Sequence, residues 1–478
     1  MDAFSPETLL LDTPLARRLY TRYAASLPIV DYHSHVDARD ICEDRHFENL
    51  SALWLAHDHY KWRILRLAGV RESDITGDGP DWEKFLAFAR ALPQAAGSPV
   101  ATWCHMELRH YFGYTGVLNE QTARQVWTRT ARRLHRPDFG VQGLLARSGV
   151  RYLATTDDPA DDLRYHLAWQ QNPALDLILS PTFRPDRALD CTKPDWPRYL
   201  ARLAGAAGCG TDTLAGTQQA LLRRMDAFAA AGCRASDHAL PRLAFAPCDA
   251  RQAAALYRRA LAGRTLTPRQ AARLQTHLLL FCAAAYQQRG WAMQLHLGCL
   301  RNVNTVQAQA LGPDTGFDCI GPSGCASLAA LLDTLQRRRA LPRMIVYSLD
   351  AGDNAYLDTL LSSFPQQEPG WLQHGSAWWF HDHAAGIAAQ LESQAQQGLL
   401  GHFIGMLTDS RSFTSFVRHD YFRRVLCSLL GRWASAGLCP PDEAALGGIV
   451  RAVCYENACR FFRLPEAGTR NNLQGGAQ

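Results

Sequence analysis

Short apolar runs alternate with longer helical patterns along most of this 478-residue chain. Eight runs have the composition of β-strands, at residues 27–35, 150–155, 177–183, 243–247, 292–298, 344–349, 371–375 and 402–407. Apolar residues at helical spacing fill segments between them, at 212–231, 268–289, 327–339 and 383–397. Parallel strands that are buried on both faces have this apolar character and need helical crossovers. Eight such units close a (β/α)8 barrel, so we expect an α/β fold of that type.

One long stretch interrupts this alternation. Residues 36–148 have little strand character, carry helical spacing and are rich in Trp, Leu and Tyr. Because so much apolar surface is costly to leave in water, we expect a helical insertion and not a linker. The predicted organisation is an N-terminal helix over 6–27 with the first strand (1–35), the insertion (36–148), and the rest of the barrel with C-terminal helices (149–478). The polar tail from Gly468 is expected to fray.

Composition excludes several classes of protein. The net charge of +5 is not gathered into a basic stripe, so we expect no nucleic-acid partner. The N-terminus has no signal-peptide pattern, and no apolar run reaches the about 18 residues that a membrane span needs. Fourteen cysteines without a CxxC pair indicate reduced thiols. We therefore expect a cytoplasmic protein without a membrane partner, whose apolar and aromatic content permits a homo-oligomer.

Polar residues suited to metal binding stand at the ends of the predicted strands. The first run ends in His33 and His35, which are two residues apart and would face the same side of a strand. The fifth run carries His296, and Asp409 follows the eighth. The strands of a barrel end at one face, so these side chains would converge there on a divalent ion. Their N and O ligand atoms suit Zn²⁺, Mn²⁺ or Fe²⁺.

Each of these residues also has an ordinary structural interpretation. His33 and His35 could lie exposed on a turn, and His296 could be a core histidine with its hydrogen bonds satisfied. Asp409 could cap a following helix. The metal site is favoured because all four residues fall at strand ends together.

Ten long stretches carry a resemblance that extends over nearly the whole chain. They include Asp-Tyr-His-Ser-His at 31–35, Asp-His-Tyr-Lys-Trp-Arg at 58–63 and Gly-Met-Leu-Thr-Asp-Ser-Arg-Ser at 405–412. The others are 103–108, 155–159, 181–186, 296–304, 314–318, 375–380 and 418–424. In these stretches the chain resembles the uronate isomerase (glucuronate isomerase) family of the amidohydrolase superfamily.

This resemblance implies a fold, a reaction and a cofactor. The fold is a distorted (β/α)8 TIM barrel of the metal-dependent hydrolase type with one divalent metal ion, Zn²⁺ before Mn²⁺ or Fe²⁺. The reaction is aldose–ketose isomerisation of a hexuronate, from D-glucuronate to D-fructuronate and from D-galacturonate to D-tagaturonate. His33, His35 and Asp409 match the metal ligands of the family, and His296 matches the strand-five histidine of the superfamily. No lysine at the predicted fourth strand (243–249) could bridge two metals, which fits a single ion.

The resemblance also implies the catalytic and substrate-binding residues. Asp409 and Tyr60 match the groups that move the proton between C2 and C1, and Arg411 matches the group that holds the C2 oxygen. A carboxylate or phenolate must reach the migrating proton, and a cation must stabilise the enediolate oxygen. Arg184 and His59 match the groups that bind the substrate carboxylate, for which a planar guanidinium is well suited.

Packing interpretations remain for several of these positions. Arg184 could be a surface charge in an Arg-Pro-Asp turn, and His59 and Tyr60 could be packing residues of the insertion. We interpret the arginines and acids of 418–424 as a structural salt-bridge cluster. Trp-Trp-Phe at 378–380 is more typical of the core or the barrel rim than of a sugar platform.

Two other functions share the same metal ligands or pocket. A metal-dependent hydrolase of the same superfamily would activate water as the nucleophile. A sugar-acid binding protein without catalytic activity would keep the pocket but would not need Asp409. The paired arginines and tyrosine favour the isomerase. Departures from the family at Val303, 350–352 and His381 are expected to affect the preference between the two hexuronates.

Overall fold

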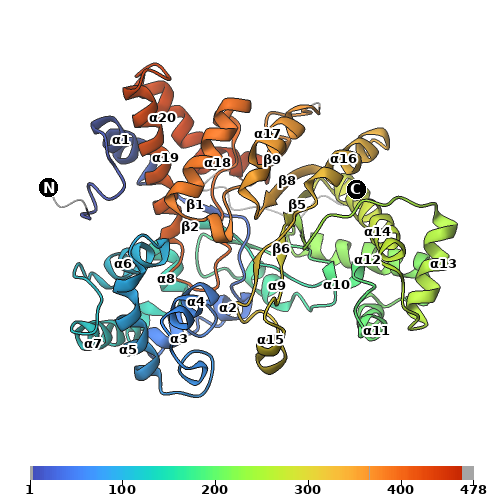
Figure 1. Ribbon diagram of the computed structural model, residues 1–478, viewed down its shortest axis with the longest axis horizontal. Coiled ribbons are helices and arrows are strands. Elements are labelled where there is room, and N and C mark those ends of the chain that lie inside the picture. Colours follow the sequence, from blue (N-terminus) through green and yellow to red (C-terminus); the bar gives the residue numbers. More distant parts are fainter. Residues whose placement is uncertain (1–3, 365, 466–478) are drawn as a thin grey trace.

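Parallel strands lie at the centre of the molecule with helices around them, as Figure 1 shows for the computed structural model. The described residues are 4–364 and 366–465, and the tail from Gly468 lies outside them. One sheet has the order β1-β2-β3, with β1 Ile29–Asp31, β2 Val150–Ala154 and β3 Ile178–Ser180. The other has the order β4-β5-β8-β9, with β4 Ala235–Leu240, β5 Ala292–Leu297, β8 Arg343–Ser348 and β9 Leu372–His374. The strands β6 (Cys299–Leu300) and β7 (Cys319–Ile320) form a separate antiparallel pair.

Isolated bridges link the strands beyond these two sheets. Phe183 forms parallel bridges with both Asp157 and Ser236, and Ser34 forms one with Ser410. The predicted α/β fold with parallel strands is therefore confirmed.

The prediction of a strand at 243–247 is wrong, because this stretch is irregular and the strand β4 precedes it. β4 has the sequence Ala-Ser-Asp-His-Ala-Leu. Its polar residues make it less apolar than the runs that were predicted as strands. Asp237 and His238 are nevertheless fully buried. No lysine occurs in β4 either.

The prediction of a strand at 402–407 is also wrong, because side chains there replace a regular backbone ladder. Ile404 N donates to Gln373 Oε1 at 3.1 Å, and Thr408 N donates to Asp31 Oδ1 at 3.0 Å. Gly405 has a φ of 84°, and a Cβ there would collide with the Val453 carbonyl oxygen. The carbonyl oxygens of His402, Phe403 and Gly405 likewise accept hydrogen bonds from side chains, those of Gln373, Asn457 and Tyr32.

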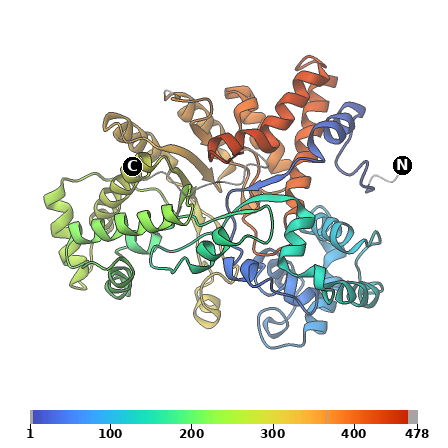
Figure 2. The same cartoon turned by 180° about the vertical axis from the view of Figure 1, so that it is seen from behind.

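Helices occupy the predicted insertion. Between β1 and β2 the structure has α2 Ala38–Cys42, α3 Leu50–Trp54, α4 His59–Leu67, α5 Asp81–Ala91, α6 Pro99–Phe112, α7 Ala123–Leu134 and α8 Val141–Ser148, without a strand in the range 36–148. Seen from behind in Figure 2, these blue-to-cyan helices again form one group, apart from the green helices. The predicted leading helix is shorter than expected, with α1 over Pro14–Leu19 followed by a π-helical turn at Tyr20–Ala24.

The remaining helices lie C-terminal to β2 in the chain. They are α9 Arg164–Gln171, α10 Asp186–Leu189, α11 Trp196–Ala207, α12 Leu214–Ala230, α13 Ala250–Leu261, α14 Pro268–Arg289, α15 Thr305–Leu311, α16 Leu328–Arg337, α17 Asn354–Ser362, α18 Ala384–Gln397, α19 Val417–Ser435, α20 Glu443–Arg451 and α21 Asn457–Phe461. Among the described residues, no helix combines the length and the apolar character that a membrane crossing requires.

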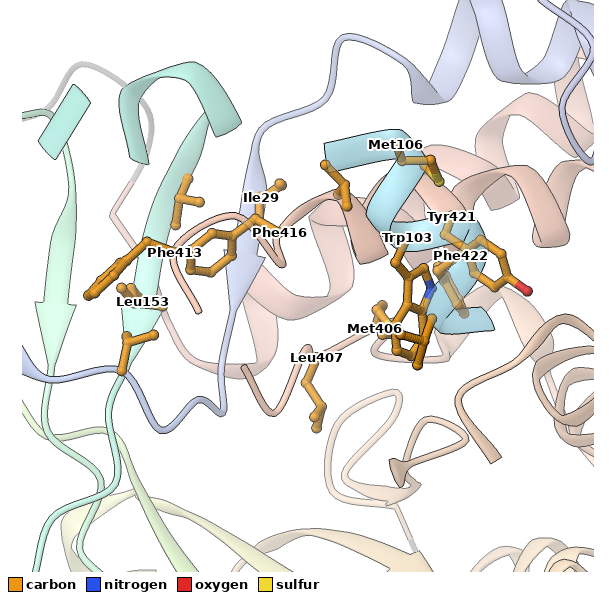
Figure 3. Packing of buried hydrophobic residues seen from close by; sticks show 14 of the residues in the cluster. Ile29, Trp103, Met106, Leu153, Met406, Leu407, Phe413, Phe416, Tyr421 and Phe422 are labelled. Atoms are coloured by element: carbon orange, nitrogen blue, oxygen red, sulfur yellow. The ribbon is translucent and has the colours of Figure 1, made fainter. Parts of the chain in front are cut away.

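Aromatic packing joins the insertion to the C-terminal helices. Trp103 and Met106 of α6 lie close to Tyr421 and Phe422 of α19 (Figure 3), and the rings of Trp103 and Tyr421 meet edge-on at 6.1 Å. All four side chains belong to one hydrophobic core with the residues of β1 and β2. Burial of large apolar side chains of this kind contributes about 1.5–3 kcal/mol each.

A close helix contact gives a test of this packing. A Cβ at Gly431 of α19 would meet the Thr13 hydroxyl and would lie 3.0 Å from the backbone nitrogen of Ala16 in α1. In Gly431→Ala, overpacking of about 1–3 kcal/mol outweighs the gain of about 1 kcal/mol from alanine in a helix, so the melting temperature should fall. Gly448 in α20 has no atom within 4 Å of such a Cβ, so Gly448→Ala should not lower it. Equal melting temperatures for both variants would contradict the close contact.

Candidate active site and metal centre

Two histidines and one carboxylate meet just beyond the end of β1. Nε2 of His33 lies 3.4 Å from Oδ1 of Asp409, and Nε2 of His35 lies 3.0 Å from the same oxygen. Backbone hydrogen bonds hold the two segments together, since Asp409 N donates to His33 O and His35 N donates to Ser410 O. The ligand atoms of these three side chains lie within 4.8 Å of one another, so they could hold a metal ion.

Asp409 is buried and strained rather than capping a helix. Its φ is 50°, a left-handed conformation that few residues other than glycine adopt. Its Oδ2 accepts a hydrogen bond of 3.0 Å from Nε1 of Trp378. Burial alone would raise its pKa, but the hydrogen bonds from His33 and His35 hold the pKa well below its usual range. The carboxylate is therefore ionised at neutral pH.

A second polar group adjoins the first through His33. Nδ1 of His296 lies 2.6 Å from Oδ1 of Asp237, and Nδ1 of His33 lies 4.0 Å from Oδ2 of the same carboxylate. These three residues form a second group whose ligand atoms also lie within 4.8 Å of one another. Burial lowers the pKa of His33, but Asp237 and Asp409 outweigh it and raise that pKa. Asp237 was not predicted as a site residue, because the fourth strand was expected at 243–247 and not at β4.

These groups open into a cavity of about 220 Å³. The cavity is lined by His33, His35, His59, Thr156, Arg184, Ala239, His296, Arg301, Asp314, Trp378, Trp379, Asp409 and Arg411. Of the eight residues predicted for the site, only Tyr60 is missing from this lining. The cavity thus combines metal ligands with three arginines, which is a combination suited to a small anionic substrate.

Arg184 does not behave as a surface charge in a turn. Its Nε donates to Oδ2 of Asp186 at 2.8 Å, and its Nη1 lies 3.3 Å from Oδ2 of Asp237. The side chain is 20% exposed, on the side that lines the cavity. Arg184 therefore connects the cavity to the buried carboxylate behind the histidines.

His59 and Tyr60 begin helix α4, where Asp58 caps the backbone N–H groups of Tyr60 and Lys61. His59 lines the cavity, and burial together with the charge of Arg411 lowers its pKa to about 4, so its imidazole is neutral at neutral pH. The Tyr60 ring stacks on His59 at 5.0 Å. Its buried hydroxyl has no hydrogen-bond partner among the described residues.

The basic cluster at 418–424 divides into two parts. Arg424 pairs with Asp420 at 2.9 Å, as expected for a structural salt bridge. Arg418 instead pairs with buried Asp382 and places its guanidinium carbon 5.2 Å from the centre of the Tyr60 ring. The charged pair Arg418–Asp382 therefore lies directly behind a predicted catalytic residue, which the sequence pattern did not reveal.

The segment 378–380 contributes to the cavity as well as to the core. Trp378 and Trp379 are both buried, and both line the cavity. The Trp379 ring contacts His59 at 5.1 Å and the Arg301 guanidinium at 5.1 Å. Trp379 also has a left-handed φ of 50°. This strain accompanies its position at the cavity wall.

Comparisons with known proteins agree with this geometry. A family model described as glucuronate isomerase matches residues 1–462. The uronate isomerase of Salmonella newport (strain SL254) is 45% identical over 471 residues, which cover 97% of this chain and 100% of the relative.

Two solved structures share the whole fold. The uronate isomerase of Thermotoga maritima has a TM-score of 0.90 and 32% identity, over 95% of this chain and 99% of its own. The glucuronate isomerase of Caulobacter crescentus has a TM-score of 0.90 and 26% identity, over 98% of each chain. With a family model over most of its length and a full-length relative at this identity, the chain belongs to the glucuronate (uronate) isomerase family.

Proposed function

We propose that this protein isomerises open-chain hexuronates, D-glucuronate to D-fructuronate and D-galacturonate to D-tagaturonate. The observation that carries the proposal is the cavity itself, where a group of metal ligands faces Arg184 and Arg411. Family membership over the whole chain supports the same reaction.

We infer that His33, His35 and Asp409 hold one divalent ion, with His296 as a further ligand. Nε2 of His296 is buried and has no hydrogen-bond partner among the described residues, and such an atom is typical of a metal environment. The imidazole and carboxylate set suits Zn²⁺ first, with Mn²⁺ or Fe²⁺ as alternatives. When bound, the ion supplies a Lewis acid that polarises substrate oxygens and stabilises negative charge on them.

Asp409 and Tyr60 are proposed to move the protons. Isomerisation removes the proton from C2, returns a proton to C1, and transfers the hydroxyl proton between the two oxygens. The ionised carboxylate of Asp409 is available as the base for the carbon-bound proton. The Tyr60 hydroxyl is buried and does not line the cavity in this structure, so its role toward the oxygens rests on the family resemblance. The Arg411 guanidinium would stabilise the C2 oxygen of the enediolate.

Arg184 and His59 are proposed to bind the rest of the substrate. Nε and Nη1 of Arg184 already face Asp186 and Asp237, so the remaining N–H groups would bind the substrate carboxylate. His59 is neutral, so it would act through hydrogen bonds and not as a histidinium.

Further proposals concern the barrel, the cellular location and the oligomeric state. We propose that the two sheets belong to one distorted (β/α)8 barrel, with residues 402–409 in place of an eighth strand and 36–148 as an insertion. The bridges from Phe183 to Ser236 and from Ser34 to Ser410 support this arrangement. A cytoplasmic location and self-association are predictions from the sequence.

The role of Asp409 can be tested with Asp409→Asn. Loss of the base should lower kcat for D-glucuronate by about 10²- to 10⁴-fold. Conversion to D-fructuronate is followed by chromatography, with D-galacturonate tested in parallel. Asp442→Asn is the matched control, because Asp442 is exposed and its side chain only caps the backbone N–H groups of Ala444 and Ala445. Full activity of Asp409→Asn would exclude it as the base, and uptake of water into the product would indicate a hydrolase.

Metal removal gives an independent test. Elemental analysis of the purified protein should find one divalent ion per chain, and dialysis against a chelator should abolish activity and lower the melting temperature, since an ion bound only to the folded state stabilises it. Zinc should restore both. His35→Ala should lose the ion, whereas His110→Ala, which changes an exposed histidine of α6, should keep it. A chelated protein that keeps full activity would contradict the metal site.

A further inference from the structure

Asp237 lies at the centre of the buried polar groups behind the cavity. It sits on β4 in register with Gln294 of β5, and its side chain is fully buried. Its Oδ1 lies 2.6 Å from Nδ1 of His296, and its Oδ2 faces Nδ1 of His33 at 4.0 Å. The contact with His296 is a hydrogen bond, whereas Nδ1 of His33 is too far away for one and has no hydrogen-bond partner among the described residues.

The ring nitrogen that carries the proton determines whether the other nitrogen of the imidazole can bind a metal. A hydrogen bond from Nδ1–H to a carboxylate fixes the proton on Nδ1 and leaves the Nε2 lone pair free for a metal. Nε2 of His296 is buried without a partner among the described residues. Nε2 of His33 faces Asp409 at 3.4 Å. Both rings therefore turn Nε2 away from Asp237.

Packing alone does not select this orientation. The His296 ring stacks on Tyr347 at 4.3 Å with an angle of 7°, and it meets Trp378 at 4.6 Å. These contacts fix the plane of the imidazole, but a ring turned over by 180° would fill nearly the same space. Only the hydrogen bond to Asp237 distinguishes the two nitrogens.

We propose that Asp237 is a positioning residue that holds His296 with its Nε2 atom toward the metal. The inference rests on the proposed metal site and deepens it. Asp237 acts through His296 and does not touch the substrate.

Arg184 explains why Asp237 is a positioning group and not a ligand. The Arg184 guanidinium lies 3.3 Å from Oδ2 of Asp237 and is held on its other side by Asp186. A buried carboxylate that is already paired with a cation has less attraction for a second one, and a metal ion there would meet the charge of Arg184. Arg184 also keeps Asp237 ionised, as its acceptor role requires: burial would raise the pKa of Asp237, but Arg184 and the histidines hold the pKa well below its usual range.

The test is the zinc affinity of the full-length protein with Asp237→Asn. The amide keeps the volume but can donate to Nδ1, which favours the wrong tautomer, so the affinity should fall about 10- to 100-fold. Affinity is measured by competition with a chromophoric chelator, alongside the melting temperature of the metal-free protein. Asp186→Asn is the matched control, because it removes the other carboxylate that pairs with Arg184, and it should keep the zinc affinity of the parent.

Three outcomes would overturn the inference. The first is an unchanged zinc affinity in Asp237→Asn, and the second is an equal loss in Asp186→Asn, which would indicate a general effect of charge on the fold. The third needs no variant: two zinc ions per chain in the parent would make Asp237 a ligand of a second ion. If zinc binding behaves as expected but the parent does not convert hexuronates, the proposed function fails while the role of Asp237 stands.

Discussion

The buried carboxylate of Asp31 accepts hydrogen bonds from both the backbone N–H and the hydroxyl of Thr408. This contact joins the end of β1 to a segment more than 370 residues later in the chain. The segment lacks a regular ladder of its own, so side chains must hold it in place. Asp409 follows immediately, and its meeting with His33 and His35 depends on this anchor. Removal of the Thr408 hydroxyl would leave the buried Asp31 carboxylate with one hydrogen bond fewer, which is destabilising.

Each buried carboxylate of the site faces histidines or an arginine. Asp409 faces two histidines, and Asp237 lies between His33, His296 and Arg184. A carboxylate removed from water is tolerated only when it is paired or hydrogen-bonded. The pairing also prepares the site for catalysis, because the groups that would bind an anion and a metal are already oriented before either arrives.

The helical insertion supplies one wall of the cavity through α4. His59 faces the cavity, and Tyr60 packs behind it against Trp103 of α6 at 6.0 Å. Helix α19 completes this wall, since Arg418 lies over both Tyr60 and Trp103. Trp103, which lies beside Tyr421 and Phe422 of α19 in Figure 3, therefore connects Tyr60 to a C-terminal helix. The helices of residues 36–148 therefore form part of the site.

The sequence by itself determined the alternation of strands and helices and the helical character of 36–148. Of the eight site residues that it predicted, seven line the cavity. Apolar periodicity and long stretches typical of the family are local signals, and they can be recognised in the sequence without knowledge of the fold. Tertiary structure alone decided the position of β4, the irregular path of 402–409, and the roles of Asp237 and Arg418. Polar residues inside a buried strand weaken its apolar pattern. Hydrogen bonds between distant segments produce no periodic pattern in the sequence. Such groups become visible only when the strands that carry them lie side by side.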